Sequence, residues 1–146
     1  MQQQSQDATL LEQVYHSADM GERGTQLLMK KSKDGSLSSK LGGFRDEYAS
    51  IKKDAADQLS AQGQAPKKAS ALETGAQWMG VQLSTLTDQS PARMAEMLVT
   101  GSAKNMVSDI QNIKRSHEAR HETRKLAGRL VALEDECLSD MKTYLN

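Results

Sequence analysis

Features that define several other protein classes are scarce in this sequence of 146 residues. It holds a single cysteine, Cys137, which cannot form an internal disulfide and fits a reducing cytoplasm. No apolar run approaches the roughly 20 residues that cross a bilayer, and the first residues lack the basic-then-apolar pattern of a signal peptide. We therefore predict a cytoplasmic protein that has no membrane as a partner.

A surplus of charge of either sign is also absent. The 19 Lys and Arg residues balance 19 Asp and Glu residues. Phosphate binding needs an excess of positive charge gathered on one face. The basic clusters, at 30–33, 52–53 and 67–68, are short and have acidic neighbours, so we interpret them as solvated faces. The sequence therefore argues against nucleic acid as a main partner.

The residues that are present favour helices. Two prolines and one phenylalanine stand against eight methionines and many Ala, Leu, Gln, Glu and Lys residues, and no segment alternates like a strand. We predict one domain over 1–146, with a frayed polar tail over 1–6. Its helices are expected at about 7–32, 37–62, 69–87, 91–115 and 118–145.

Apolar spacings of three and four residues define the predicted inward faces. The second helix is the most regular, with Leu37, Leu41, Phe44, Tyr48, Ile51, Ala55 and Leu59. The fourth segment is expected to bury Met94, Met97, Leu98, Met106, Val107, Ile110 and Ile113, and the last Leu126, Leu130, Leu133, Cys137, Met141 and Tyr144. Asp7, Ser36 and Ser90 are predicted N-caps, the last of them before Pro91, and a break is expected near Ser116.

These elements predict an all-α fold: a ferritin-like four-helix bundle with an additional crossover helix between the second and third long helices. Ferritin-like bundles carry one long connection that runs the length of the bundle, about 40 Å for helices of this size. The segment 64–90 can cover this distance, and its own helix supplies about 28 Å of it.

Matching heights along the helices suggest one candidate metal site. Glu22, Glu47, Glu96 and Glu134 fall near one level of the predicted bundle, and Tyr48 lies on the core-facing stripe beside them. Carboxylates suit hard cations, so such a site would bind iron or manganese.

The opposing interpretation is that these acids are solvated. Glu22, Glu47 and Glu134 each sit one step off the inward stripe, and Ser50 and Cys137 occupy positions where a Glu-x-x-His motif would place histidine. The only Glu-x-x-His, from Glu118 to His121, lies at the start of the last helix, away from the middle of the bundle. We therefore favour a bundle without a cofactor.

Other residues that could carry chemistry are predicted to be structural. Cys137 lies on the apolar stripe and is interpreted as inert core packing. Gly21 and Gly101, at core-facing helix positions, are expected to allow close approach of neighbouring helices.

The stretch Ser90-Pro-Ala-Arg-Met-Ala-Glu-Met-Leu-Val-Thr-Gly-Ser102 resembles a segment of small, uncharacterised ferritin-like bacterial proteins. The similarity extends to Met20-Gly21, Tyr48 and the closing Lys142-Thr-Tyr-Leu145. In that family pattern a histidine stands where this sequence has Arg93, and an acid where it has Arg23. The resemblance thus implies a fold in which any metal site has degenerated, with internal Arg–Glu pairs as its replacement.

Two functional hypotheses follow. The first is a non-catalytic, ferritin-like interaction or structural protein that forms a homodimer. The second is a carboxylate-rich metal-binding protein or oxidoreductase that uses Glu22, Glu47, Tyr48, Glu96 and Glu134 with iron or manganese. We prefer the first hypothesis.

Overall fold

The computed structural model describes residues 2–67 and 86–146. They form four helices: α1 (Gln2–Lys31), α2 (Gly35–Ala61), α5 (Pro91–Arg115) and α6 (His121–Lys142). No strand occurs in either of these two stretches. The prediction of an all-α four-helix bundle is therefore confirmed for this part of the chain.

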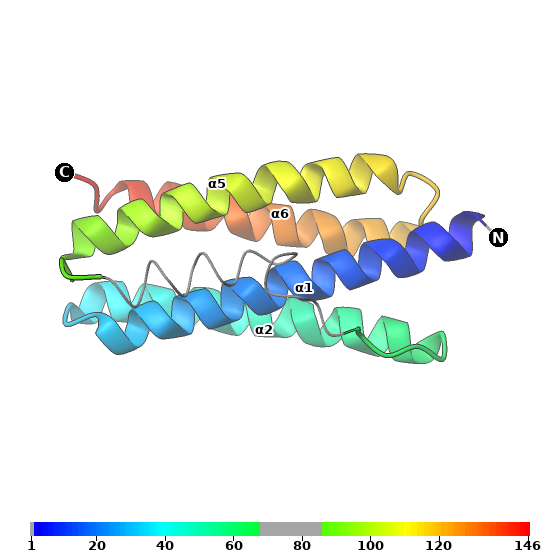
Figure 1. Cartoon of the computed structure of the whole chain (residues 1–146), viewed down its shortest axis with the longest axis horizontal. Helices are drawn as coiled ribbons and strands as arrows, with labels where there is room; N and C mark the ends of the chain where they lie inside the picture. Colours follow the sequence, from blue (N-terminus) through cyan, green and yellow to red (C-terminus); the bar gives the residue numbers. More distant parts are fainter. Residues whose placement is uncertain (1, 68–85) are drawn as a thin grey trace.

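Polar contacts at the two ends of the bundle establish the helix directions. Asp7 near the start of α1 contacts Gln62 after α2 and Arg120 before α6. At the opposite end, Ser36 in the first turn of α2 forms a hydrogen bond of 3.0 Å with Tyr144 after α6. The helices α2 and α5 therefore run in the same direction, antiparallel to α1 and α6 (Figure 1). The connection from 62 to 90 joins opposite ends of the bundle.

The core lies between two helical hairpins, α1 with α2 and α5 with α6, which make the most extensive contacts. Each helix contributes an apolar stripe with helical spacing. All seven stripe residues predicted in the second helix are buried, from Leu37 to Leu59, and so are the predicted Leu126, Leu130, Leu133, Cys137 and Met141 of α6. The regular spacing alone was enough to predict these two faces.

The predicted inward face of α5 is wrong in its second half. Val107 is 56% exposed and Ile110 is 37% exposed, whereas Asp109 between them is buried. The buried positions follow Leu98 by four and eleven residues, at Ser102 and Asp109. Polar residues thus continue the core face of α5 in its second half. The apolar residues next to them lie at the edge of the core or on the surface.

Several helix ends differ from the prediction. The first helix begins at Gln2, so residues 2–6 are helical and Asp7 is an internal, buried residue instead of an N-cap. Asp34, and not Ser36, caps α2, because its Oδ1 accepts the Leu37 N–H at 2.8 Å. Ser90 caps α5 as predicted, and Ser116 ends it. The predicted helix over 69–87 lies, except for its last two residues, outside the described residues.

Gly21 confirms one expected close approach. A Cβ atom on Gly21 would lie 2.5 Å from Cε1 of Tyr48, so only glycine lets this aromatic ring rest against α1. At Gly101, in contrast, an added Cβ would meet nothing within 4 Å in the part of the chain that the structure describes. No other described helix therefore makes the close approach expected at Gly101.

Substituting Gly21 tests this contact. Gly21→Ala is expected to lower the free energy of unfolding by about 1–3 kcal/mol, because the new methyl group must displace a buried ring. The matched control is Gly43→Ala, at an exposed position of α2 with open space around it. There the higher helix propensity of Ala should add about 1 kcal/mol. Urea unfolding measures both values, and a stabilised Gly21→Ala variant would contradict the contact.

Candidate functional site

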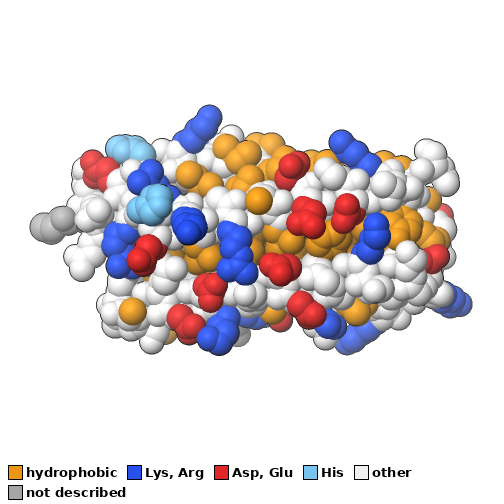
Figure 2. All heavy atoms as spheres, turned by 180° about the vertical axis from the view of Figure 1, so that it is seen from behind, with side chains coloured by type: hydrophobic (Ala, Val, Ile, Leu, Met, Phe, Trp, Pro, Cys, Tyr) orange, Lys and Arg blue, Asp and Glu red, His pale blue; other side chains and the backbone are white. Residues whose placement is uncertain are grey.

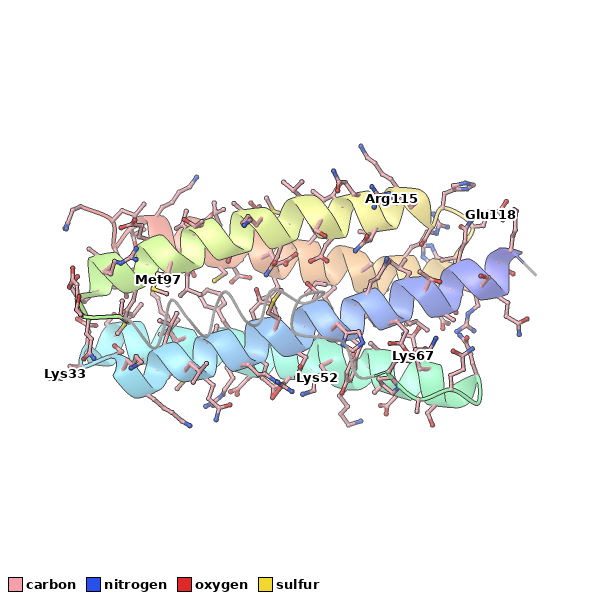
Figure 3. All side chains as sticks on the ribbon, in the orientation of Figure 1. Lys33, Lys52, Lys67, Met97, Arg115 and Glu118 are labelled. Atoms are coloured by element: carbon pink, nitrogen blue, oxygen red, sulfur yellow. The ribbon has the colours of Figure 1, made fainter. Side chains whose placement is uncertain are left out.

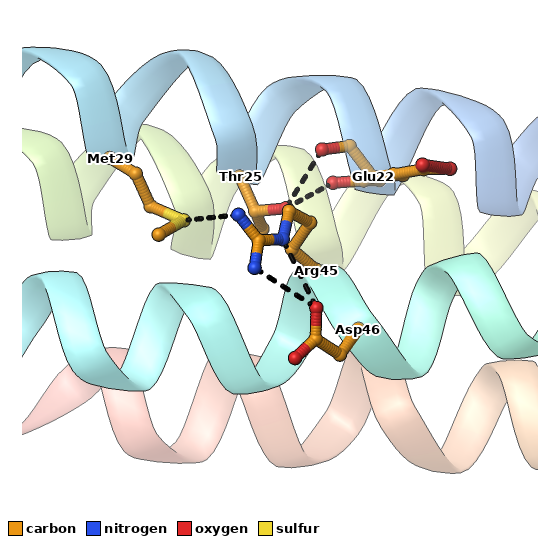
Figure 4. A network of polar contacts seen from close by, with 6 residues as sticks. Glu22, Thr25, Met29, Arg45 and Asp46 are labelled. Carbon is orange, nitrogen blue, oxygen red and sulfur yellow. Dashed lines mark hydrogen bonds and ion pairs between the residues drawn. The ribbon is translucent and has the colours of Figure 1, made fainter.

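Glu22 of the predicted metal site lies on the outer side of the α1–α2 hairpin. Its Oε2 is 3.0 Å from Nζ of Lys52, which also contacts Asp19 at 3.0 Å. Figure 3 shows Lys52 on this outer side of α2. The backbone carbonyl of Glu22 accepts the hydroxyl of buried Thr25 at 3.0 Å, as Figure 4 shows. Its carboxylate therefore already has a cationic partner at the surface.

Glu47 and Glu96 are surface residues as well. The Glu47 side chain is 61% exposed and lies 3.6 Å from Arg129 of α6. The Glu96 side chain is 63% exposed and pairs with Arg93 at 3.2 Å, one helical turn away. The structure thus does not bring the four predicted carboxylates together. Their predicted heights along the helices match, but among the four only Glu134 is buried in the core.

The two arginines that differ from the family pattern occupy the surface. Arg23 pairs with Asp19 at 3.1 Å, and its side chain is 72% exposed. Arg93 pairs with Glu96, itself exposed. Neither forms an internal pair with a buried acid, so the replacement of a metal by internal Arg–Glu pairs is wrong, and the other placement expected of the preferred hypothesis, outward surface charges, describes both arginines.

Glu134 and Tyr48 are the two predicted site residues that lie in the core. Glu134 is 1% exposed and Tyr48 is 4% exposed. Glu134 follows Leu130 by four residues and precedes Cys137 by three, which places it on the buried face of α6. It was interpreted as a flank residue because Leu133 beside it also points inward.

Asp109 of α5 is the partner of Glu134 that the sequence analysis missed. The two carboxyl groups lie within hydrogen-bonding reach of each other. Ser17 of α1 donates its hydroxyl to Oδ2 of Asp109 at 2.8 Å. Within the described part of the chain, no other group donates a hydrogen bond to either Glu134 oxygen. Four helices thus enclose a carboxyl pair, with Tyr48 supplied by α2.

The surroundings favour one proton held between these two acids. Burial, and then the hydrogen bond and the charge of Asp109, raise the pKa of Glu134 from 4.5 to about 10. Burial also raises the pKa of Asp109, although the Ser17 hydroxyl favours its ionised form. Glu134 is therefore the protonated member at neutral pH, and its O–H donates to Asp109. The pair titrates as a unit.

The Tyr48 hydroxyl and the Cys137 thiol next to the carboxyl pair stay protonated and unreactive at neutral pH. Burial raises the pKa of the Tyr48 hydroxyl well above 10, and the nearby Cys137, Glu134 and Asp109 add to the shift. Burial likewise raises the pKa of Cys137 to about 11, and the side chain is 0% exposed. Because the thiolate is the reactive form, Cys137 is core packing, as predicted.

A signal for Asp109 was present in the sequence. Ser102, Asp109 and Ser116 repeat every seven residues, and all three are buried. A heptad spacing keeps residues on one face of a helix. The predicted inward face rested on apolar residues alone and was therefore placed at Val107 and Ile110.

A second polar cluster closes the end of the bundle where α1 begins. Asp7 is buried, and its carboxylate accepts hydrogen bonds from the Gln62 amide, from the Arg120 N–H at 3.1 Å and from the Arg120 Nε at 3.3 Å. Burial raises the pKa of Asp7, but donors from Thr123, Gln62 and Arg120 outweigh it and leave this pKa below its usual value. An open cavity of about 340 Å³ lies beside the cluster.

The described residues offer little to a metal ion. Among them, no three His, Cys, Asp or Glu side chains are placed to hold one. Glu118 and His121 are exposed at the α5–α6 turn, where Figure 3 shows Glu118, far from Glu134. The best that the core provides is two carboxyl groups with Tyr48 and Ser17 nearby.

Comparisons with known proteins add no relative. No protein-family model, curated protein or solved structure matches the chain significantly. None of the four described helices is both long and apolar enough to cross a membrane.

Proposed function

We propose that this chain is a non-catalytic helical bundle that acts as an interaction or structural protein, with a degenerate metal site in its core. The observation that carries the proposal is the burial of Asp109, Glu134 and Tyr48 in the core. Asp109 is 7% exposed, Tyr48 4% and Glu134 1%, so these groups present almost no surface to a substrate. Because its core acids are buried, we infer that the protein interacts with its partners through its surface.

A ferritin-like arrangement is part of this proposal. The helices α2 and α5 are parallel, and the residues between them link opposite ends of the bundle (Figure 1). One long crossover between the second and third long helices is typical of ferritin-like bundles. In such bundles the metal lies between the helices, which is where the Asp109–Glu134 pair holds a proton instead.

The surface ion pairs support the loss of a metal site. Lys52 neutralises Glu22, Arg129 lies beside Glu47, and Arg93 pairs with Glu96. Each predicted ligand outside the core therefore has a cation of the protein itself as its partner. We place this protein in the cytoplasm as a homodimer that needs neither nucleic acid nor membrane.

One observation favours the alternative, a metal-binding protein or oxidoreductase that uses iron or manganese. Both oxygens of Glu134 are buried and accept no hydrogen bond from a described residue, and the one polar partner of this carboxyl group among those residues is Asp109, to which it donates. A cation bound to Asp109 and Glu134, with Tyr48 beside it, would satisfy these oxygens. Metal and proton would then compete for one place.

Metal analysis separates the two functions. The purified protein, before and after incubation with Fe²⁺ or Mn²⁺ and gel filtration, is analysed by plasma mass spectrometry. The control is the double variant Asp109→Asn/Glu134→Gln, which keeps the shape of both side chains and removes their charge. We expect less than about one tenth of a metal ion per chain, equal in both proteins, because two carboxyls sharing a proton bind divalent ions weakly.

Thermal unfolding with and without EDTA provides the second measurement. The proposed function predicts the same Tm in both conditions, since no bound metal stabilises the folded state. A stoichiometric metal that is absent from the double variant, with a Tm that falls when EDTA is added, would overturn it in favour of the metalloprotein.

A further inference from the structure

The outward face of α6 carries two basic and two acidic side chains between Glu122 in its first turn and Lys142 in its last turn, both of them exposed. Arg124 and Lys125 lie in the first half and Asp135 and Glu136 in the second, and all four are exposed. The surface seen from behind shows several basic side chains toward the end where the N-terminus lies, with a few acidic ones among them, and further acidic side chains nearer the middle (Figure 2). Among the described residues, Lys125, Asp135 and Glu136 form no ion pair.

The spacing of these charges makes the face complementary to itself. Lys125 and Glu136 are eleven residues apart, as are Arg124 and Asp135. Eleven residues make three helical turns to within about 20°, so each pair shares one side of the outward face. Both pairs are centred at the level of Leu130. A second α6, antiparallel and related by a two-fold axis at this level, would therefore place Lys125 opposite Glu136 and Arg124 opposite Asp135 of its copy.

The centre of the same face permits close approach of the second helix. Gly128 and Ala132 lie on either side of Leu130, and both are exposed. A Cβ on Gly128 would meet no described residue within 4 Å, so packing against the described part of the chain does not require glycine there. Glycine at an exposed position inside a helix costs about 1 kcal/mol relative to Ala. The presence of glycine at position 128 is accounted for if a neighbouring helix backbone needs the space that a side chain would fill.

We propose that a second copy of this chain docks on the outward face of α6, with the two α6 helices antiparallel. Two contacts of Lys125 with Glu136 and two of Arg124 with Asp135 frame a centre formed by Gly128 and Ala132. Because the charged contacts lie at the rim, association weakens as the salt concentration rises. The interface rests on the proposed function: it identifies the interaction partner of this chain as a second copy of the same chain.

Charge reversal with rescue tests the interface. Sedimentation velocity measures the dissociation constant of the wild type and of Lys125→Glu, Glu136→Lys and the double variant Lys125→Glu/Glu136→Lys, at protein concentrations up to about 1 mM. Each single variant puts like charges opposite each other twice in the dimer, so we expect at least a tenfold weaker association. The double variant exchanges the two charges and should return to within about threefold of the wild type.

Lys114→Glu is the matched control, since it makes the same change in net charge at an exposed position of α5. It should leave the dissociation constant within about twofold of the wild type. The proposal is overturned if the wild type sediments as a monomer at every concentration. It is equally overturned if Lys125→Glu and Lys114→Glu have the same effect, or if the double variant is as weak as the single variants. A monomeric wild type would remove the homodimer from the proposed function together with this interface, whereas a dimer that Lys125→Glu leaves intact would overturn this interface alone. The metal content is independent of all these results.

Discussion

Glu134→Gln is expected to stabilise the protein at neutral and alkaline pH. In the unfolded chain this carboxyl group loses its proton near pH 4.5, whereas burial beside Asp109 keeps it protonated in the folded state. The folded state therefore binds more protons, and its free energy of unfolding falls as pH rises from about 5, by at most about 1.4 kcal/mol per pH unit. The fall ends once the pH passes the raised pKa. A glutamine is neutral at every pH and still donates to Asp109.

The effect is measured by urea unfolding between pH 5 and pH 9. At pH 7 we expect the Gln variant to be more stable than the wild type by up to about 3 kcal/mol, with a flatter dependence on pH. Glu96→Gln is the control, because its side chain is 63% exposed and its pairing with Arg93 should contribute less than about 1 kcal/mol. A wild type with constant stability over this range would contradict the shared proton.

Asp7→Ala should have the second large effect, in the opposite direction. The substitution leaves the Gln62 amide and the Arg120 backbone N–H without their acceptor beside the open cavity at this end of the bundle. A hydrogen bond to a charged group contributes about 1.5–3 kcal/mol and water in the cavity replaces part of each, so we expect a loss of about 2–4 kcal/mol in the free energy of unfolding. Asp7→Asn keeps one acceptor oxygen and should lose about half as much.

The control for Asp7 is Asp57→Ala, an exposed acid whose pair with Lys53 should contribute less than about 1 kcal/mol. The lowered pKa of Asp7 adds a dependence on pH. Its contribution is complete above the unfolded value of 3.8 and is lost as pH falls through the lower folded value. Equal losses in Asp7→Ala and Asp57→Ala would show that Asp7 does not hold the end of the bundle.

Local patterns were sufficient for the helices and most of the core. The four-and-three spacing of α2 identifies its buried face without ambiguity, because no polar residue interrupts it. The start of α1 could not be predicted in this way. Asp7 is a residue type that often caps a helix, and it precedes an apolar pattern. Its hydrogen-bond partners, however, are Gln62 and Arg120, which lie 55 and 113 residues away in the chain. Contacts over such distances leave no local pattern.

The candidate site was predicted in part, for a related reason. Glu134 and Tyr48 were identified, whereas Glu22, Glu47 and Glu96 were placed beside them on height alone. Height along a bundle follows from chain length, but the direction of a side chain follows from the angular position of each helix. That position depends on packing. Asp109 was missed because a polar residue on a core face interrupts the apolar pattern that identifies the face.

The hydrogen bond from Ser17 to Asp109 crosses between the two hairpins, and this has a consequence for how they dock. Leucine and methionine faces tolerate a slip of one helix along another with modest loss, since one apolar contact replaces a similar one. A slip of one turn between the hairpins would instead take Asp109 away from the Ser17 hydroxyl and place it at the level of Gln13 or Gly21 of α1, while Glu134, in the same hairpin as Asp109, would move with it. Polar residues at such positions can select a single register at a cost in stability. We expect that Asp109→Leu/Glu134→Leu would yield a bundle with more than one alignment of its hairpins.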